Sequence, residues 1–179
     1  MGWTKAILAL CLGGIGASCA AAPAPPLRLH LMTEASPPIS MIEHAHVVGS
    51  GTEKVAEIMQ RTGTSYSMQL LPWKRAYLEL QQRPDGCLFS TTRTPEREAQ
   101  FQWVGPTDEA DWVLLGRADR NYNLHVLEDA RKLRIGTYHG DARDVFLRER
   151  GFQVDSAPND MLNPDKLLLD RIDLWAASL

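Results

Sequence analysis

The sequence predicts an α/β protein of two lobes, in which each lobe is a mostly parallel sheet flanked by helices. Two observations favour this fold class. Apolar residues occupy every second position in some segments and recur with helical spacing in the segments between them. These segments follow one another in the order β-α-β-α-β, and the order occurs twice, which is typical of parallel sheets covered by helices. A chain of 179 residues with 44% hydrophobic residues is able to bury such a core.

Five segments make up the first unit. The sequence LRLHLM has leucine at every second position, which predicts a strand with one buried face. In the helix that follows, Ser50 and Glu53 have the spacing of a capping box and Gly63 marks the end. The next helix begins at Pro72. The predicted segments are a strand at 27–32, a helix at 50–63, a strand at 66–71, a helix at 72–82 and a strand at 87–90.

The second unit follows a crossover, 101–118, which contains the two apolar runs FQWV and WVLLG. Gly151 ends one of its helices, and Asn163 is expected to cap the other, with Pro164 in the first turn. Two units joined in this way imply two lobes, with a cleft at the carboxyl ends of the strands. The predicted segments are a short helix at 128–133, a strand at 134–138, a helix at 141–151, a strand at 152–154, a helix at 163–170 and a strand at 172–177.

The first 22 residues have the three-part order of a secretory signal peptide. Lys5 precedes the apolar run AILALCLGGIGA, and small residues follow, so cleavage is expected near 20–22 with an Ala/Pro linker at 23–26. Cys19 follows GAS, which resembles the lipid-attachment box of bacterial lipoproteins, so a lipid anchor is the alternative to a soluble secreted protein. After cleavage Cys87 is the only cysteine certain to remain, and no internal disulfide is expected.

The charge balance argues against nucleic acid as a partner. The chain has 19 Lys+Arg against 22 Asp+Glu, a net charge of −3, and therefore lacks the basic excess that attracts a phosphate backbone. His44 and His46 have a spacing that could bind a transition metal, but no nearby His or Cys completes the ligand set. We therefore expect neither a metal nor a cofactor.

The stretch LFSTTRTPERE, 88–98, is the most distinctive polar loop of the chain. Thr94 has the place of a helix N-cap and Pro95 that of the first helical residue. A helix start favours anions, and hydroxyls and guanidinium groups here could converge on a carboxylate. The alternative is a capped helix whose arginines pair with surface glutamates, and the local pattern favours neither interpretation. The candidate side chains are Ser90, Thr91, Thr92, Arg93 and Arg97.

Several motifs, in order, resemble the family 3 bacterial extracellular solute-binding proteins, the periplasmic amino-acid-binding components of ABC importers. They are EASPPIS, LPWKRAYLEL, GCLFSTTRTPERE with FQWVGP, RIGTYHGDARDVFLRERGF and DRIDLWAAS. The resemblance covers 27–179 and implies the two-lobed type II periplasmic binding fold, with lobe 1 at 27–115, lobe 2 at 116–179 and a hinge near 112–118. Family members return from lobe 2 to lobe 1, so the resemblance also implies a C-terminally truncated chain with an incomplete second lobe.

The resemblance assigns roles to individual residues. Arg97 matches the arginine that grips the ligand carboxylate, and Ser90 and Thr92 match loop positions that contact the ligand. Ser178 stands where amino-acid binders of the family usually have an aspartate for the ligand ammonium, so the resemblance implies no carboxylate partner for an ammonium at that position.

The start of the second-lobe helix, Gly140, Asp141 and Ala142, departs from the family, which often has a hydroxyl residue after the glycine. Asp141 is expected to cap this helix, and the alternative is that it faces a ligand ammonium. Glu34 and Trp73 are further cleft candidates, because one follows the first strand and the other opens the second helix; the alternatives are a surface charge and a core aromatic residue.

The implied function is binding without chemistry. A small carboxylated solute, with an amino acid as the leading ligand, would be captured between the lobes and delivered by a monomeric periplasmic protein to the membrane permease of an ABC transporter. One alternative is a ligand-sensing module of a signalling system. Another is a periplasmic enzyme on the same fold, such as a dehydratase, but no nucleophile and base stand out, and no catalytic residue is expected.

Overall fold

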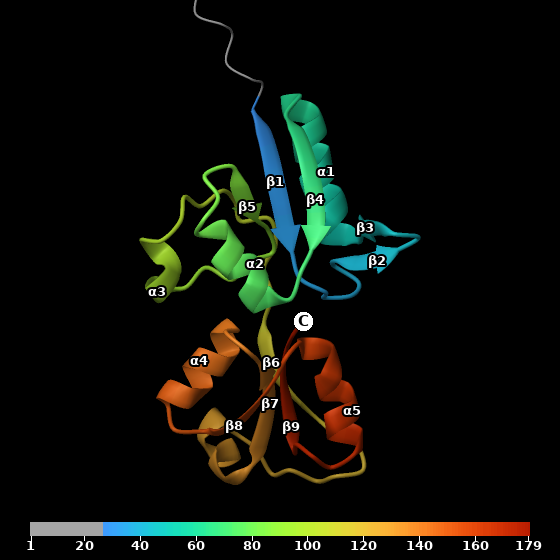
Figure 1. Ribbon diagram of the computed structural model, residues 1–179. Coiled ribbons are helices and arrows are strands. Elements are labelled where there is room, and N and C mark those ends of the chain that lie inside the picture. Colours follow the sequence, from blue (N-terminus) through green and yellow to red (C-terminus); the bar gives the residue numbers. More distant parts are fainter. Residues whose placement is uncertain (1–26) are drawn as a thin grey trace, which may run out of the picture.

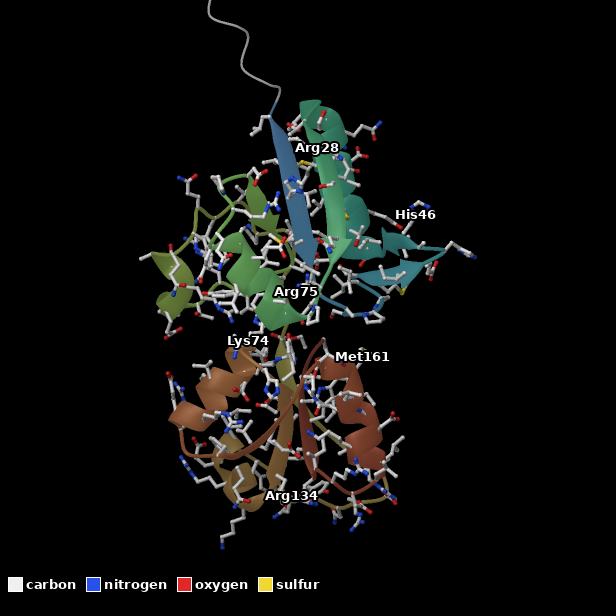
Figure 2. The ribbon with its side chains drawn as sticks, viewed as in Figure 1. Arg28, His46, Lys74, Arg75, Arg134 and Met161 are labelled. Carbon is white, nitrogen blue, oxygen red and sulfur yellow. The ribbon has the colours of Figure 1, made fainter. Side chains whose placement is uncertain are left out.

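A computed structural model of the chain describes residues 27–179, so the predicted signal peptide, the linker and Cys19 lie outside the described residues. The chain forms two lobes that are stacked end to end in Figure 1 and, with side chains drawn, in Figure 2, and β6 lies in the crossover between them. This arrangement confirms the predicted fold class. None of the helices within 27–179 combines the length and the apolar character that crossing a membrane requires.

The first lobe contains a parallel sheet with the strand order β4-β1-β5. Neighbouring residues of β1 point to opposite faces, so Leu31 packs with Val55 of α1 while Met32 packs with Ala76 of α2. The helices therefore cover the two faces of the sheet (Figure 1). The elements of this lobe are β1 (Arg28–Thr33), β2 (Met41–Glu43), β3 (His46–Val48), α1 (Ser50–Thr62), β4 (Ser65–Leu70), α2 (Trp73–Leu80), β5 (Gly86–Leu88) and α3 (Pro95–Glu98).

The second lobe contains a sheet with the order β6-β9-β7-β8, in which β6 is antiparallel to β9 and the other pairs are parallel. Its core includes Ile135, Leu147, Phe152 and Leu174. The elements are β6 (Trp112–Gly116), the 3-10 helix η1 (Leu127–Lys132), β7 (Arg134–Tyr138), α4 (Ala142–Glu149), β8 (Gln153–Ala157), the 3-10 helix η2 (Asp160–Leu162), α5 (Asn163–Leu168) and β9 (Leu174–Ser178).

The two apolar runs of the crossover have different structures. The apolar run at 101–104 forms no strand, and its aromatic rings pack edge to face instead, with Phe101 between Tyr77 and Trp103. The whole of β6 pairs with β9. The second sheet therefore begins at Trp112, whereas the boundary expected between residues 115 and 116 falls inside a strand.

The helix starts also differ from the predicted caps. Gly49, with φ 122°, precedes α1, and its carbonyl accepts the backbone N–H of Glu53, so the predicted capping box of Ser50 is wrong. A Cβ at Gly49 would lie 2.7 Å from the Pro38 carbonyl oxygen, which is why glycine is needed there. Asn163 is the first residue of α5 and provides no cap, because its amide donates to the Thr137 carbonyl oxygen at 2.9 Å.

Candidate functional site

The carboxyl ends of the two sheets face each other where the lobes meet. Glu34 directly follows β1, and Tyr138 is the last residue of β7. The Tyr138 hydroxyl donates a hydrogen bond of 2.7 Å to Glu34 Oε1 and so joins the first lobe to the second. Ligands of α/β proteins bind outside the carboxyl ends of parallel strands, so this boundary is the place where a site is expected.

Arg97 is held at this boundary by both lobes. Its side chain lies against the rings of Trp73 and Tyr77, with Cζ 5.0 Å and 5.5 Å from the two ring centroids. Nη1 donates to the Thr92 carbonyl oxygen at 3.0 Å, and Nη2 donates across the boundary to the Gly140 carbonyl oxygen at 3.1 Å. Only 8% of Arg97 is exposed. A planar guanidinium fixed in this way can offer two parallel N–H groups to a carboxylate.

Trp73 provides the second contact to Gly140. It is buried, it begins α2, and its Nε1 donates to the Gly140 carbonyl oxygen at 2.8 Å. One carbonyl of the second lobe thus accepts hydrogen bonds from two side chains of the first. Gly140 has φ 78°, in the left-handed region that glycine adopts without strain.

Asp141 caps α4, which confirms one of the two alternatives for this residue. Its Oδ1 accepts the backbone N–H of Arg143 at 2.9 Å and the Arg143 Nε at 2.7 Å. Ala142, the first residue of the helix, is buried. The Arg143 guanidinium also lies 5.5 Å from the centroid of the Tyr138 ring. The carboxylate of Asp141 is therefore occupied by its own helix and by a buried arginine.

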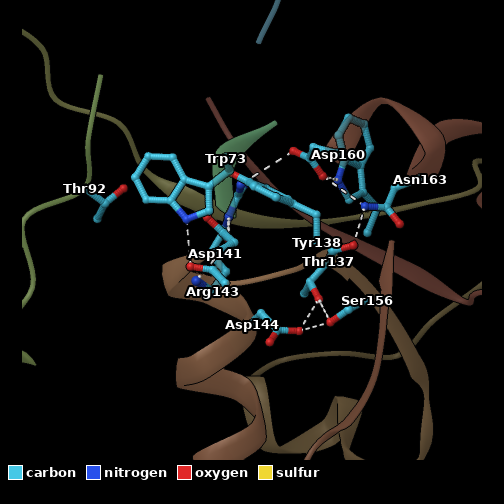
Figure 3. A network of polar contacts seen from close by, with 12 residues as sticks. Trp73, Thr92, Thr137, Tyr138, Asp141, Arg143, Asp144, Ser156, Asp160 and Asn163 are labelled. Carbon is cyan, nitrogen blue, oxygen red and sulfur yellow. Dashed lines mark hydrogen bonds and ion pairs between the residues drawn. The ribbon is translucent and has the colours of Figure 1, made fainter. Parts of the chain in front are cut away.

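A second carboxylate, Asp160, extends this network, which Figure 3 shows from close by. Its Oδ1 accepts from Trp175 Nε1 at 2.8 Å and from Asn163 Nδ2 at 2.9 Å, and Oδ2 lies 3.5 Å from Nη2 of Arg143. Burial lowers the pKa of Arg143, but Asp141 and Asp160 raise it more, so the pKa lies above its ordinary value. The second-lobe side of the boundary thus carries two negative charges and one positive charge.

Glu34 is a carboxyl group of the boundary whose pKa is shifted by its surroundings. The pKa of Glu34 is raised from 4.5 to about 7, chiefly by burial and in addition by the negative charges of Asp141 and Asp160, while the hydrogen bond from Tyr138 opposes the shift. Burial also raises the pKa of Tyr138 above its ordinary value, so that side chain remains a hydroxyl.

Solved structures of binding proteins match this arrangement of lobes, whereas no protein-family model and no curated protein matches the chain. An ancestral arginine-binding protein bound to glutamine is similar with a TM-score of 0.75 at 19% identity, over 87% of this chain and 71% of that one. The chain has the periplasmic-binding-protein fold. The arginine-, lysine-, histidine-binding protein ArtJ from the thermophilic bacterium Geobacillus stearothermophilus has a TM-score of 0.75 at 18% identity, over 85% of this chain and 67% of that one.

A third structure with this fold comes from a signalling protein. It is a histidine kinase sensor domain with similarity to periplasmic binding proteins, and its TM-score is 0.80 at 17% identity, over 86% of this chain and 69% of that one. The fold is therefore shared by amino-acid-binding proteins and by the sensor domain of a histidine kinase.

The periplasmic-binding-protein fold brings together five of the residues singled out in the sequence. Glu34, Trp73, Arg97, Gly140 and Asp141 meet at the boundary, in contacts that cross it or flank it. These residues lie in α2, in α3, directly after β1 and in the turn between β7 and α4, segments far apart in the sequence.

The hydroxyl residues of the loop have other surroundings. Ser90 is exposed and has φ 56°. The Thr91 hydroxyl donates to the Leu88 carbonyl oxygen at 3.2 Å, and Thr92 contributes its backbone carbonyl to Arg97. Ser178 is exposed at the end of β9. Within residues 27–179, none of these hydroxyl groups forms a hydrogen bond with the Arg97 guanidinium.

The two arginines of the loop have different roles. Arg93 is exposed, and its Nε donates to Glu98 Oε2 at 2.7 Å, which is the surface pairing that the sequence offered as one alternative. The helix α3 has only four residues, and Thr94 makes no side-chain capping bond. The start of this helix therefore offers less to an anion than the sequence suggested. Arg97, in contrast, is buried and donates to carbonyl oxygens of both lobes, those of Thr92 and Gly140.

Sequence reasoning missed four residues of this region: Tyr77, Tyr138, Arg143 and Asp160. A signal was present for Tyr138, which is the last residue of a predicted strand and so belongs to the carboxyl edge of a parallel sheet. Arg143 and Asp160 belong to the site only through contacts that form on folding, so no local sequence signal identifies them.

Proposed function

We propose that this protein binds a small carboxylated solute, with an amino acid as the leading ligand, between its two lobes. The observation that carries the proposal is the position of Arg97. Its guanidinium is buried between aromatic rings at the boundary, and its Nη2 points to the opposite lobe. Burial of an arginine without a carboxylate partner costs free energy, and a ligand carboxylate would offset that cost.

The ligand carboxylate would take the place of the Gly140 carbonyl oxygen on Arg97. Charge-assisted hydrogen bonds contribute roughly 1.5–3 kcal/mol each, which is more than a bond to a neutral carbonyl. Trp73 and Tyr77 exclude water from one face of the guanidinium and so strengthen this interaction. Backbone groups and hydroxyls of Ser90, Thr91 and Thr92 would complete the first-lobe side.

Glu34 would receive a cationic group of the ligand, such as an ammonium. The other two carboxylates of the boundary, Asp141 and Asp160, already pair with Arg143. A cation placed beside Glu34 would favour its ionised form and lower its pKa. Gly140, Ala142 and Ser178 would line the second-lobe side of the cleft.

The physiological role that follows is capture of the solute in the periplasm and delivery to the membrane permease of an ABC transporter. The resemblance to family 3 solute-binding proteins supports this role, as does the fold shared with ArtJ, an arginine-, lysine-, histidine-binding protein. We propose that the protein is exported through its signal peptide and acts as a monomer, without catalysis.

Ligand sensing is the second candidate function. The sensor domain of a histidine kinase has this fold with a TM-score of 0.80, and in a sensor the closing of the lobes would signal to a partner protein. In the native host, deletion of the gene would separate the two functions: loss of solute uptake supports transport, whereas intact uptake with loss of a transcriptional response to the solute supports sensing.

Binding can be tested by a thermal-shift screen against the amino acids, followed by calorimetric titration of any ligand found. Wild-type protein should be stabilised by mass action. Arg97→Ala and Arg97→Lys should lose about 2–5 kcal/mol of binding free energy, because Lys keeps the charge but lacks the planar fork. Arg93→Ala is the matched control from the same loop and should bind as the wild type does.

Two results would contradict the assignment of Arg97. The first is full ligand stabilisation of both Arg97 variants. The second is an equal loss in Arg93→Ala, which would point to the whole loop and not to one guanidinium.

A further inference from the structure

Three side-chain hydrogen bonds described above join the lobes at the candidate site. Trp73 and Arg97 both donate to the Gly140 carbonyl oxygen, and Tyr138 donates to Glu34. An indole N–H, a guanidinium and a backbone carbonyl keep their protonation states between pH 4 and 8. Of these three contacts, the one between Glu34 and Tyr138 therefore includes the group whose charge can change in that range.

The surroundings of Glu34 oppose its ionisation when the lobes are together. The second lobe faces Glu34 with the hydroxyl of Tyr138 from β7, Asp141 before α4, Arg143 in α4 and Asp160 in η2. Arg143 already pairs with both aspartates. An ionised Glu34 would thus add a third negative charge to a group with one positive charge, in a largely buried position.

A protonated Glu34 avoids this repulsion and keeps its contact with the second lobe. The carbonyl oxygen of a neutral carboxylic acid still accepts the 2.7 Å hydrogen bond from the Tyr138 hydroxyl. The contact between the lobes is therefore compatible with both protonation states, but only the neutral state is free of the electrostatic cost.

We propose that Glu34 and Tyr138 form a proton-controlled latch, which holds the two lobes together when Glu34 is protonated and weakens when Glu34 ionises. The inference goes beyond solute binding. It rests on the proposed function only in assuming that the lobes can separate, and it predicts a pH effect in the absence of any solute.

The direction of the pH effect follows from linkage between closure and proton binding. Separation of the lobes would return Glu34 to water and to its ordinary pKa of 4.5, whereas contact raises the pKa to about 7. The closed form therefore binds the proton more tightly. The proton on Glu34 stabilises the closed form fully below pH 4.5, and this stabilisation is lost as the pH rises through 7. The equilibrium constant for closing changes on the order of a hundredfold over this range.

The latch can be tested by small-angle X-ray scattering of the purified protein, without added solute, from pH 4.5 to 8.5. We expect the radius of gyration to increase as the pH rises, with most of the change between pH 5 and 8. Glu34→Gln mimics the protonated acid and should remain closed throughout the range. Tyr138→Phe removes the hydrogen bond and should open at a lower pH than the wild type.

His139→Gln is the matched control, because His139 neighbours Tyr138, is exposed and carries an imidazole ring. It should leave the wild-type profile unchanged. A wild-type radius that does not vary with pH would overturn the proposal, as would a Glu34→Gln profile equal to that of the wild type, or a profile abolished by His139→Gln. Because no solute is added, failure of the latch is distinct from failure of the proposed solute binding.

Discussion

Replacement of Asp141 by alanine is expected to lower the free energy of unfolding by about 3–5 kcal/mol. Asp141 has two roles, since its Oδ1 caps α4 and also pairs with the Arg143 Nε at 2.7 Å. Loss of an N-cap costs about 1 kcal/mol, whereas removal of one partner of a buried ion pair costs about 3–5 kcal/mol. In the alanine variant Asp160, at 3.5 Å from Arg143, would still pair with that arginine. The combined loss of the cap and of the Asp141–Arg143 pair therefore stays near the range for the buried pair alone.

Urea denaturation, followed by circular dichroism and tryptophan fluorescence, measures this loss. Asp129→Ala is the matched control: Asp129 is exposed and accepts the backbone N–H groups of His125 and Val126 at 2.8 and 3.1 Å, so it is a capping aspartate without a buried arginine. Its removal should cost about 1 kcal/mol. Asp141→Asn keeps a capping acceptor and removes the charge, and it should lie between the wild type and Asp141→Ala.

The comparison of the two alanine variants shows whether the buried pair of Asp141 and Arg143 contributes to stability. If Asp141→Ala costs no more than Asp129→Ala, the buried pair with Arg143 contributes nothing to stability and the reasoning is refuted. If Asp141→Asn is as stable as the wild type, the carboxylate acts through its geometry and not through its charge.

Two further changes test the packing beneath the site. Gly136→Ala would place a Cβ against Ile172 Cδ1 and 2.7 Å from Asn163 Oδ1, and this overpacking should cost about 1–3 kcal/mol, measured as a lower melting temperature. Thr137→Val removes a hydroxyl that donates to Asp144 Oδ1 at 2.7 Å and should cost about 1–3 kcal/mol, measured in urea; an unchanged denaturation midpoint would show that Asp144 finds another donor.

The elements of the fold could be predicted because each depends on a local pattern. Alternation in LRLHLM identified β1 within one residue of its observed bounds, and Gly63 marked the end of α1, where it adopts the left-handed conformation. The short β2–β3 hairpin was missed because three-residue strands carry too little alternation to recognise. Helix caps were the least predictable, since Ser50 and Asn163 have suitable side chains but lie inside their helices.

The candidate site was harder to predict than the fold, because its contacts join residues far apart in the chain. Local pattern could not separate Arg93 from Arg97, which lie in the same loop four positions apart. The resemblance favoured Arg97. In the folded chain the two arginines have different partners, because Arg93 pairs with a surface glutamate and Arg97 donates to Gly140 in the opposite lobe. Likewise, nothing near Glu34 in the sequence indicates that it contacts Tyr138. That contact forms only because the two sheets meet at their carboxyl ends.

The Gly140 carbonyl explains how Arg97 could bind a ligand without loss of the contact between the lobes. This carbonyl accepts from Trp73 as well as from Arg97, so a carboxylate that takes the guanidinium would leave it still hydrogen-bonded. The exchange replaces a bond to a neutral oxygen by a charge-assisted bond, which is roughly twice as strong, and exposes no unsatisfied buried group. In the proposed complex Trp73 would keep its hydrogen bond to Gly140 while Arg97 bound the carboxylate. The contribution of Arg97 to affinity would then be the free-energy difference between its bond to the ligand carboxylate and its bond to the Gly140 carbonyl oxygen.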